Sequence, residues 1–268
     1  MAEKKTKQKL APSKQNDKIY LVYMAVSLLV VAMLFLLPKE GFVSDYARYL
    51  IIGISQTAVV AFAAVMGILA VRKFTLQSAM GWGIFLISLG VASWAIANTI
   101  WTVYTLVGVD MPYPSVADIF YVGIIPLTLA GVYTLFRSFG FKLDLKTTLK
   151  YAILPVIVGS GIFYIFVIDK MFEKVGLLMK ALNITYPLGD VLFVSFALFV
   201  LAATKGSAMF KPTAILLGGY LVFSIADLGF VLTTSLGTYY TGCWVTGLFT
   251  LGFAIVGAGL YSFKEVFD

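Results

Sequence analysis

The stretch PTAILLGGYLVFSIADLGFVLTTSL, residues 212–236, decides the class of this protein. About 20 apolar residues of helix cross the roughly 30 Å hydrocarbon core of a bilayer. This stretch is long enough to do so, and Asp227 is its only charged residue. The whole chain has 60% hydrophobic residues, 12% charged residues and a mean hydropathy of +0.96, far from the composition of a soluble domain. We therefore expect an integral membrane protein.

Apolar runs of comparable length recur along the chain. They lie at 19–37, 49–71, 79–106, 116–136, 149–168, 187–204, 212–236 and 239–263. These runs predict an all-α, polytopic fold with eight transmembrane helices, of which the sixth is the shortest. Because the connections are short, we expect a single transmembrane domain over 19–263. A disordered basic tail over 1–18 would precede it, and a short C-terminus over 264–268 would follow it.

The positive charges are distributed unevenly between the two sides that these spans define. If the N-terminus is cytoplasmic, fifteen of the 20 Lys and Arg residues lie on the inner side, including six lysines within 1–18. The positive-inside rule then predicts a multi-pass protein of the cell membrane with both termini in the cytoplasm. The lysine-rich tail is interpreted as a solvated cytoplasmic segment, and no nucleic-acid partner is expected. The sequon 183-NIT-185 would face outside, where its glycosylation depends on the host.

The two halves of the chain show an internal similarity, found by aligning 96-IAN-98 with 225-IAD-227 and 61-AFA-63 with 195-SFA-197. Both halves contain four spans and run in the same direction through the bilayer. This predicts a parallel 4+4 duplication about an axis along the membrane normal. The alignments pair Asn98 with Asp227, Gly108 with Gly237, and Gln56 with Asp190.

The chain contains no histidine, and Cys243 is its only cysteine. Histidine-ligated haem, histidine-based zinc sites and a Ser-His-Asp triad are therefore excluded. One cysteine also forms neither an intrachain disulfide nor a thiolate cluster. We expect no cofactor and no metal.

Carboxylates inside the apolar spans are the residues that point to function. An aspartate at the centre of a membrane helix costs at least ~2.5 kcal/mol, so such residues usually face a protein interior or a wet cavity. Asp227 lies fifteen residues beyond Pro212, about 22 Å along its helix, with no helix end nearby. Asp118 and Asp190 each follow a Tyr-Pro pair, where capping a helix N-terminus is the alternative explanation.

Five polar residues are expected at one level, in the outer third of the membrane: Gln56, Asn98, Asp118, Asp190 and Asp227. We predict that they line an outward-opening pocket without a cationic partner. Tyrosines and tryptophans flank this level, although an interfacial aromatic belt is the favoured explanation for Tyr239 and Tyr240. The predicted ligand-binding residues are Gln56, Asn98, Trp101, Asp118, Tyr121, Asp190, Asp227, Tyr240 and Trp244.

Four motifs occur in the order YPSVAD (113–118), YPLGD (186–190), SIAD (224–227) and GTYYTGCW (237–244). Over roughly residues 80–263, this order resembles the multi-helix membrane sensor region found ahead of diguanylate cyclase (GGDEF), phosphodiesterase and histidine kinase domains. The resemblance implies a module that senses an extracytoplasmic or membrane signal and passes it through its last helix. Only KEVFD follows Phe263, so the resemblance implies a stand-alone copy that signals through a separate cytoplasmic protein.

Two further functions remain open. The stretches GDVLFV (189–194) and SIADLGFVL (224–232) are similar to intramembrane lysoplasmalogenase-type hydrolases, in which Asp190 and Asp227 would act as acid and base on a lipid. A proton-coupled transporter is the second alternative, because acidic groups in a duplicated bundle could alternate their protonation. We favour a non-enzymatic sensory or ligand-binding module. Its partners would be the bilayer and a small molecule, a cation or a lipid head group.

Overall fold

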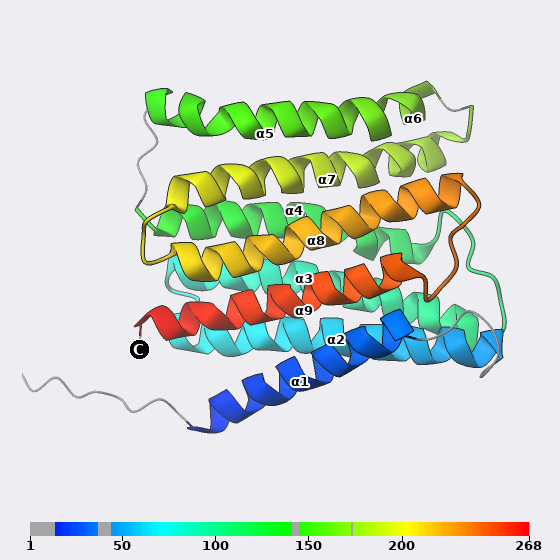
Figure 1. The fold of residues 1–268 in the computed structure, drawn as a ribbon, viewed down its shortest axis with the longest axis horizontal. Helices are drawn as coiled ribbons and strands as arrows, with labels where there is room; N and C mark the ends of the chain where they lie inside the picture. The colour runs from blue at the N-terminus through cyan, green and yellow to red at the C-terminus, as the bar shows by residue number, and fades with distance from the viewer. Residues whose placement is uncertain (1–13, 37–43, 141–144, 173, 268) are drawn as a thin grey trace, which may run out of the picture.

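The computed structural model describes residues 14–36, 44–140, 145–172 and 174–267, which contain helices and no strands (Figure 1). Eight of the helices are long and apolar enough to cross a membrane, which confirms the expected all-α, multi-pass fold. A short helix, α6 (Ile168–Phe172), follows α5, and a 3-10 helix, η1 (Phe263–Phe267), follows α9. The long helices are α1 (Lys14–Leu36), α2 (Asp45–Phe74), α3 (Ala79–Leu106), α4 (Val116–Ser138), α5 (Leu145–Phe166), α7 (Leu177–Thr204), α8 (Phe210–Ser235) and α9 (Trp244–Ser262).

The N-terminal tail is shorter than the sequence suggested. Helix α1 begins at Lys14, so the last residues assigned to the tail over 1–18 belong to the first helix. The remainder of that tail, 1–13, lies outside the described residues.

The sixth span differs most from its sequence-based prediction. It was expected to begin at Pro187, because proline favours the first turn of a helix. Helix α7 instead begins at Leu177 and contains Pro187 in its interior, so the sixth span is among the longest and not the shortest. Membrane helices tolerate internal prolines because neighbouring groups satisfy the freed backbone carbonyl. Asp190 consequently lies thirteen residues into α7, about 20 Å along its axis.

Six helices form a closed ring. Contacts run from α2 to α3, α4, α7, α8, α9 and back to α2. Helix α1 packs outside the ring against α2 and α9, and α5 packs outside it against α7, so these two helices lie at opposite edges of the molecule (Figure 1). The interior of the ring is therefore enclosed by protein, whereas α1 and α5 present apolar side chains such as Leu29 and Ile153 outward.

The ring repeats its contacts in the way that a parallel duplication predicts. The contacts of α1 with α2, α2 with α3, and α3 with α4 recur as α5 with α7, α7 with α8, and α8 with α9. The two halves then meet through equivalent pairs, α2 with α9 and α7 with α4. An evolutionary duplication stays a prediction, but the spatial equivalence sets α2 and α3 opposite α7 and α8 across the interior.

The aligned glycines Gly108 and Gly237 end α3 and α8 in the same way. Both have positive φ, +69° and +67°, which glycine adopts without the penalty that a Cβ atom would impose. The amide of the following residue closes the turn onto the helix, from Val109 to the Tyr104 carbonyl (3.1 Å) and from Thr238 to the Thr233 carbonyl (2.9 Å). The two helices therefore end in the same turn, and residues of both following loops line one cavity.

Candidate ligand cavity

A cavity of about 640 Å³ lies inside the ring. Its wall comes from α2, α3, α4, α7, α8 and α9 and from the loops 107–115 and 236–243. It therefore lies at the end of the bundle where those two loops connect the helices, which we call the loop end. Its size falls in the range of small-molecule sites, roughly 300–1,000 Å³.

Most of the residues singled out in the sequence lie together on this wall, although the role of each as a ligand contact stays a prediction. Those that line the cavity are Gln56, Asn98, Trp101, Asp118, Tyr121, Asp190 and Asp227. Tyr240 and Trp244 do not line it. The Arg48 guanidinium carbon lies 5.9 Å from the centroid of the Tyr240 ring. Trp244 is 47% exposed and packs on Gly229 of α8.

The Asp118 carboxylate is fully engaged by neighbouring groups. Its Oδ2 accepts hydrogen bonds from the backbone N–H (2.6 Å) and the hydroxyl (3.1 Å) of Ser115, which completes a capping box at the start of α4. Its Oδ1 accepts the hydroxyl hydrogen of Tyr186 on α7. Asp118 thus caps α4, as the alternative explanation from sequence proposed, and also joins α4 to α7.

Asp190 has the opposite environment. It is 1% exposed, and neither carboxylate oxygen has a hydrogen bond of ordinary geometry to any described residue. Its neighbours are the Asp227 carboxyl group and the Ser224 hydroxyl of α8, and that hydroxyl is likewise buried without such a bond. Because Asp190 is in the middle of α7, the capping explanation from sequence is wrong for this residue. Its position was missed because Pro187 was taken as a helix start.

Asp227 completes a carboxyl pair on the wall of the cavity. It is surrounded by protein yet partly exposed, because its carboxyl group faces the open space. Among the described residues that line this cavity there is no Lys or Arg. Two adjacent carboxyl groups at low dielectric repel each other, so a proton or a cation has to lie between them.

Two amides occupy the equivalent place in the other half of the ring. The Asn98 Nδ2 donates to Thr57 Oγ1 (2.7 Å) and to the Gly53 carbonyl (3.4 Å), and the Gln56 Nε2 donates to the Thr246 carbonyl (3.4 Å). Their N–H groups are therefore directed into the helices. Their side-chain oxygens, which accept no hydrogen bond from the described residues, are left for the cavity.

Aromatic rings close the inner end of the cavity. Trp94 contacts Tyr121, Phe249 and Phe253 with ring centroids 5.6, 5.9 and 4.7 Å apart. Phe223 packs on Phe249 and Phe253 in the same layer. The sequence places tryptophans only beside the level of the polar residues, because an apolar helix gives no indication of which side faces inward. It therefore does not single out Trp94 as part of the cavity wall.

The loop end carries two tyrosines near the mouth of the cavity. The Tyr113 hydroxyl donates to Asn183 Oδ1 (2.6 Å), which connects the loop before α4 to α7. The ring of Tyr239 packs edge-on against Phe230, with centroids 4.7 Å apart. Burial raises the pKa of Tyr239 to about 12, so its hydroxyl stays protonated at neutral pH. Asn183 lies within helix α7 and faces the cavity, unlike the exposed loop residue that glycosylation requires.

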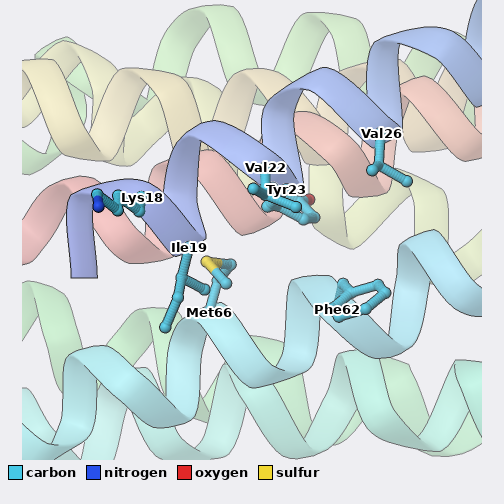
Figure 2. Close-up of a pocket in the computed structure, with 7 residues that line it drawn as sticks. All are labelled: Lys18, Ile19, Val22, Tyr23, Val26, Phe62 and Met66. Carbon is cyan, nitrogen blue, oxygen red and sulfur yellow. The ribbon is translucent and has the colours of Figure 1, made fainter. Parts of the chain in front are cut away.

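A second hollow, of about 220 Å³, lies between α1 and α2 (Figure 2). Val22, Val26, Phe62 and Met66 line most of it. The hydroxyl of its one tyrosine, Tyr23, donates to the carbonyls of Phe253 and Ala254 and is unavailable to a ligand. This groove suits a hydrocarbon chain and not a polar molecule.

Among the described residues, no group of three or more Asp, Glu, Cys or His side chains is arranged to hold a metal ion. The carboxyl pair and the aromatic rings are thus the chemical features of the main cavity. No protein-family model, curated protein or solved structure matches the chain.

Proposed function

We propose that this membrane protein is a ligand-binding, sensory module whose cavity takes up a small molecule from the loop end. The observation that carries the proposal is the Asp190 side chain, which is buried on the cavity wall beside Asp227 and has no hydrogen bond of ordinary geometry to a described residue. A buried charge without a partner is costly, and such strained polar groups are retained mainly at functional sites. A ligand supplies the missing partner.

In this proposal the loop end faces the exterior of the cell, as the excess of Lys and Arg on the other side favours. Occupancy of the cavity is transmitted to a separate cytoplasmic signalling protein. The resemblance to sensor regions of cyclases and kinases supports that output. A neighbouring gene for a kinase or cyclase without its own membrane region would add support.

A binding screen tests the proposal. Purified protein in lipid nanodiscs is unfolded by heat in the presence of amines, carboxylic acids, alcohols or lysophospholipids. A ligand at 100 times its Kd stabilises the folded state by about 2.7 kcal/mol. The compound class that contains the ligand is therefore expected to raise the Tm of the protein. The rise is expected to vanish in Asp227→Asn and to persist in Asp110→Asn, an exposed loop aspartate at the same end that does not line the cavity. The absence of any stabilising class, or an equal rise in both variants, contradicts the proposal.

A second candidate is an intramembrane lipid hydrolase, which the adjacency of Asp190 and Asp227 favours. Paired aspartates that share a proton act as acid and base on water in other hydrolases. Incubation with ester and ether lysophospholipids, followed by mass spectrometry, is expected to release products with the wild type and not with Asp190→Asn or Asp227→Asn. If no lipid is cleaved, this candidate is rejected while the binding proposal stands. Transport would need a route through the aromatic layer beneath the cavity, where Thr128 and Tyr220 form a buried hydrogen bond (3.1 Å).

A further inference from the structure

The charge of the cavity is opposite to that of the whole protein. The chain carries a formal net charge of +7, yet Asp118, Asp190 and Asp227 line the cavity, and no Lys or Arg does in the part of the chain that the structure describes. Clefts lined by one sign of charge concentrate ions of the opposite sign. The cavity therefore attracts cations and repels anions.

A proton or a cation relieves the repulsion between Asp190 and Asp227, and a cation reaches the pair from the cavity. Asp118 is already engaged by Ser115 and Tyr186, so it does not compete for that cation. Asp190 has no hydrogen bond of ordinary geometry to a described residue, and its neighbours are the Ser224 hydroxyl and another carboxyl group, that of Asp227. A positively charged donor that contacts Asp227, the partly exposed member of the pair, neutralises the repulsion between the two carboxyl groups.

The opposite half of the ring also presents hydrogen-bond acceptors to the cavity, but these are neutral amides. Both N–H groups of the Asn98 amide and one N–H of the Gln56 amide are used within the protein, and the side-chain oxygens of both residues are acceptors on the cavity wall. Both polar pairs thus accept hydrogen bonds, and the pair on α7 and α8 is acidic. This asymmetry suits a ligand that has a cationic end and a neutral donor group.

The remaining wall distinguishes an organic cation from a metal ion. Trp94, Trp101 and Tyr121 present aromatic rings, whose faces attract ammonium groups and whose area buries hydrocarbon. The described residues contain no set of three metal-ligating Asp, Glu, Cys or His groups. Resting on the proposed binding function, we infer that the ligand is an organic ammonium ion held between the Asp190–Asp227 pair and these rings.

Charged thiol reagents measure this preference directly. In a Cys243→Ser background, Thr234→Cys places a thiol on the cavity wall, seven residues and two helical turns from Asp227 on α8. Val109→Cys places a thiol on the exposed loop at the same end, outside the cavity. Both are treated with a trimethylammonium-ethyl or a sulfonate-ethyl methanethiosulfonate, which differ in charge. In each reaction the thiolate forms a disulfide and methanesulfinate leaves.

The measured quantity is the reaction rate with the cationic reagent divided by that with the anionic reagent. This ratio is expected to be about tenfold or more higher at Thr234→Cys than at Val109→Cys. Adding Asp227→Asn, or Asp190→Asn if the first variant does not fold, brings the ratio close to that of the control. Equal ratios at the two thiols overturn the ammonium inference alone. If Thr234→Cys reacts with neither reagent while Val109→Cys reacts with both, the cavity is closed and the proposed function also fails.

A second measurement separates organic from inorganic cations. Thermal unfolding is compared in tetramethylammonium, ethylammonium and sodium chloride at equal ionic strength, with tert-butanol as the neutral counterpart. At least one ammonium salt is expected to raise the Tm above that in sodium chloride, and the difference is expected to disappear in Asp227→Asn but not in Asp110→Asn. Equal Tm values in all the salts overturn the assignment of an organic ammonium ligand.

Discussion

Asp190 of α7 and Asp227 of α8 present their carboxyl groups to each other inside the ring of six helices. Changing aspartate to asparagine is therefore expected to have opposite effects on the free energy of unfolding at Asp190 and at Asp118. Asp190→Asn replaces one of two repelling carboxyl groups by an amide that can donate to Asp227. We expect the free energy of unfolding to rise by about 1–3 kcal/mol, the usual cost of an unsatisfied buried group.

Asp118→Asn is the matched control, because the Asp118 carboxylate accepts hydrogen bonds of ordinary geometry and the Asp190 carboxylate does not. Loss of the capping box and weakening of the Tyr186 bond should lower the free energy of unfolding by about 1–2 kcal/mol. Thermal unfolding in one detergent measures both variants. A loss at Asp190→Asn as large as that at Asp118→Asn contradicts the view that Asp190 lacks a partner.

The bond between Asp118 and Tyr186 is expected to couple α4 to α7. In a double-mutant cycle with Asp118→Asn and Tyr186→Phe, the two stability losses should fall short of additivity by about 1 kcal/mol, since either change removes the same bond. The comparator is Tyr113→Phe, which removes the bond to Asn183 and should cost less, because the Tyr113 side chain is 44% exposed. Full additivity of the first pair would show that the bond contributes nothing.

Adjacent glycines on α8 should respond differently to the same change. A Cβ atom at Gly219 would lie 2.7 Å from the Val256 backbone nitrogen of α9, whereas none of the surrounding atoms lies within 4 Å of one at Gly218. Gly219→Ala should therefore lower the free energy of unfolding by about 1–3 kcal/mol. Gly218→Ala should be neutral or stabilising by up to about 1 kcal/mol, since alanine favours helix. Similar Tm values for the two variants would refute this close approach of α8 to α9.

Membrane orientation can be tested with single thiols in the Cys243→Ser background. We expect Val109→Cys to react with an impermeant maleimide in intact cells, because the positive-inside rule places the loop end outside. Ala208→Cys, exposed in the loop between α7 and α8, should react only after the membrane is permeabilised. The reverse pattern would turn the mouth of the cavity towards the cytoplasm.

Local sequence was sufficient to predict the number of membrane-spanning helices and the presence of an acidic residue within one of them. Bilayer thickness sets the length of each span, and the cost of a charge in hydrocarbon marks Asp227 as interior wherever its helix packs. The equivalence of Gly108 and Gly237 was also readable, because both α3 and α8 end where glycine allows a positive φ.

The pairing of Asp190 with Asp227, the bond between Asp118 and Tyr186 and the outward position of Trp244 depended on how the helices pack. A membrane helix is apolar on its lipid face and on its buried face alike, so composition does not reveal its rotation. Packing within the ring also lets α7 continue through Pro187, which carries Asp190 from the expected membrane surface into the interior. The cavity exists because six helices, each unremarkable alone, turn their few polar groups towards one space.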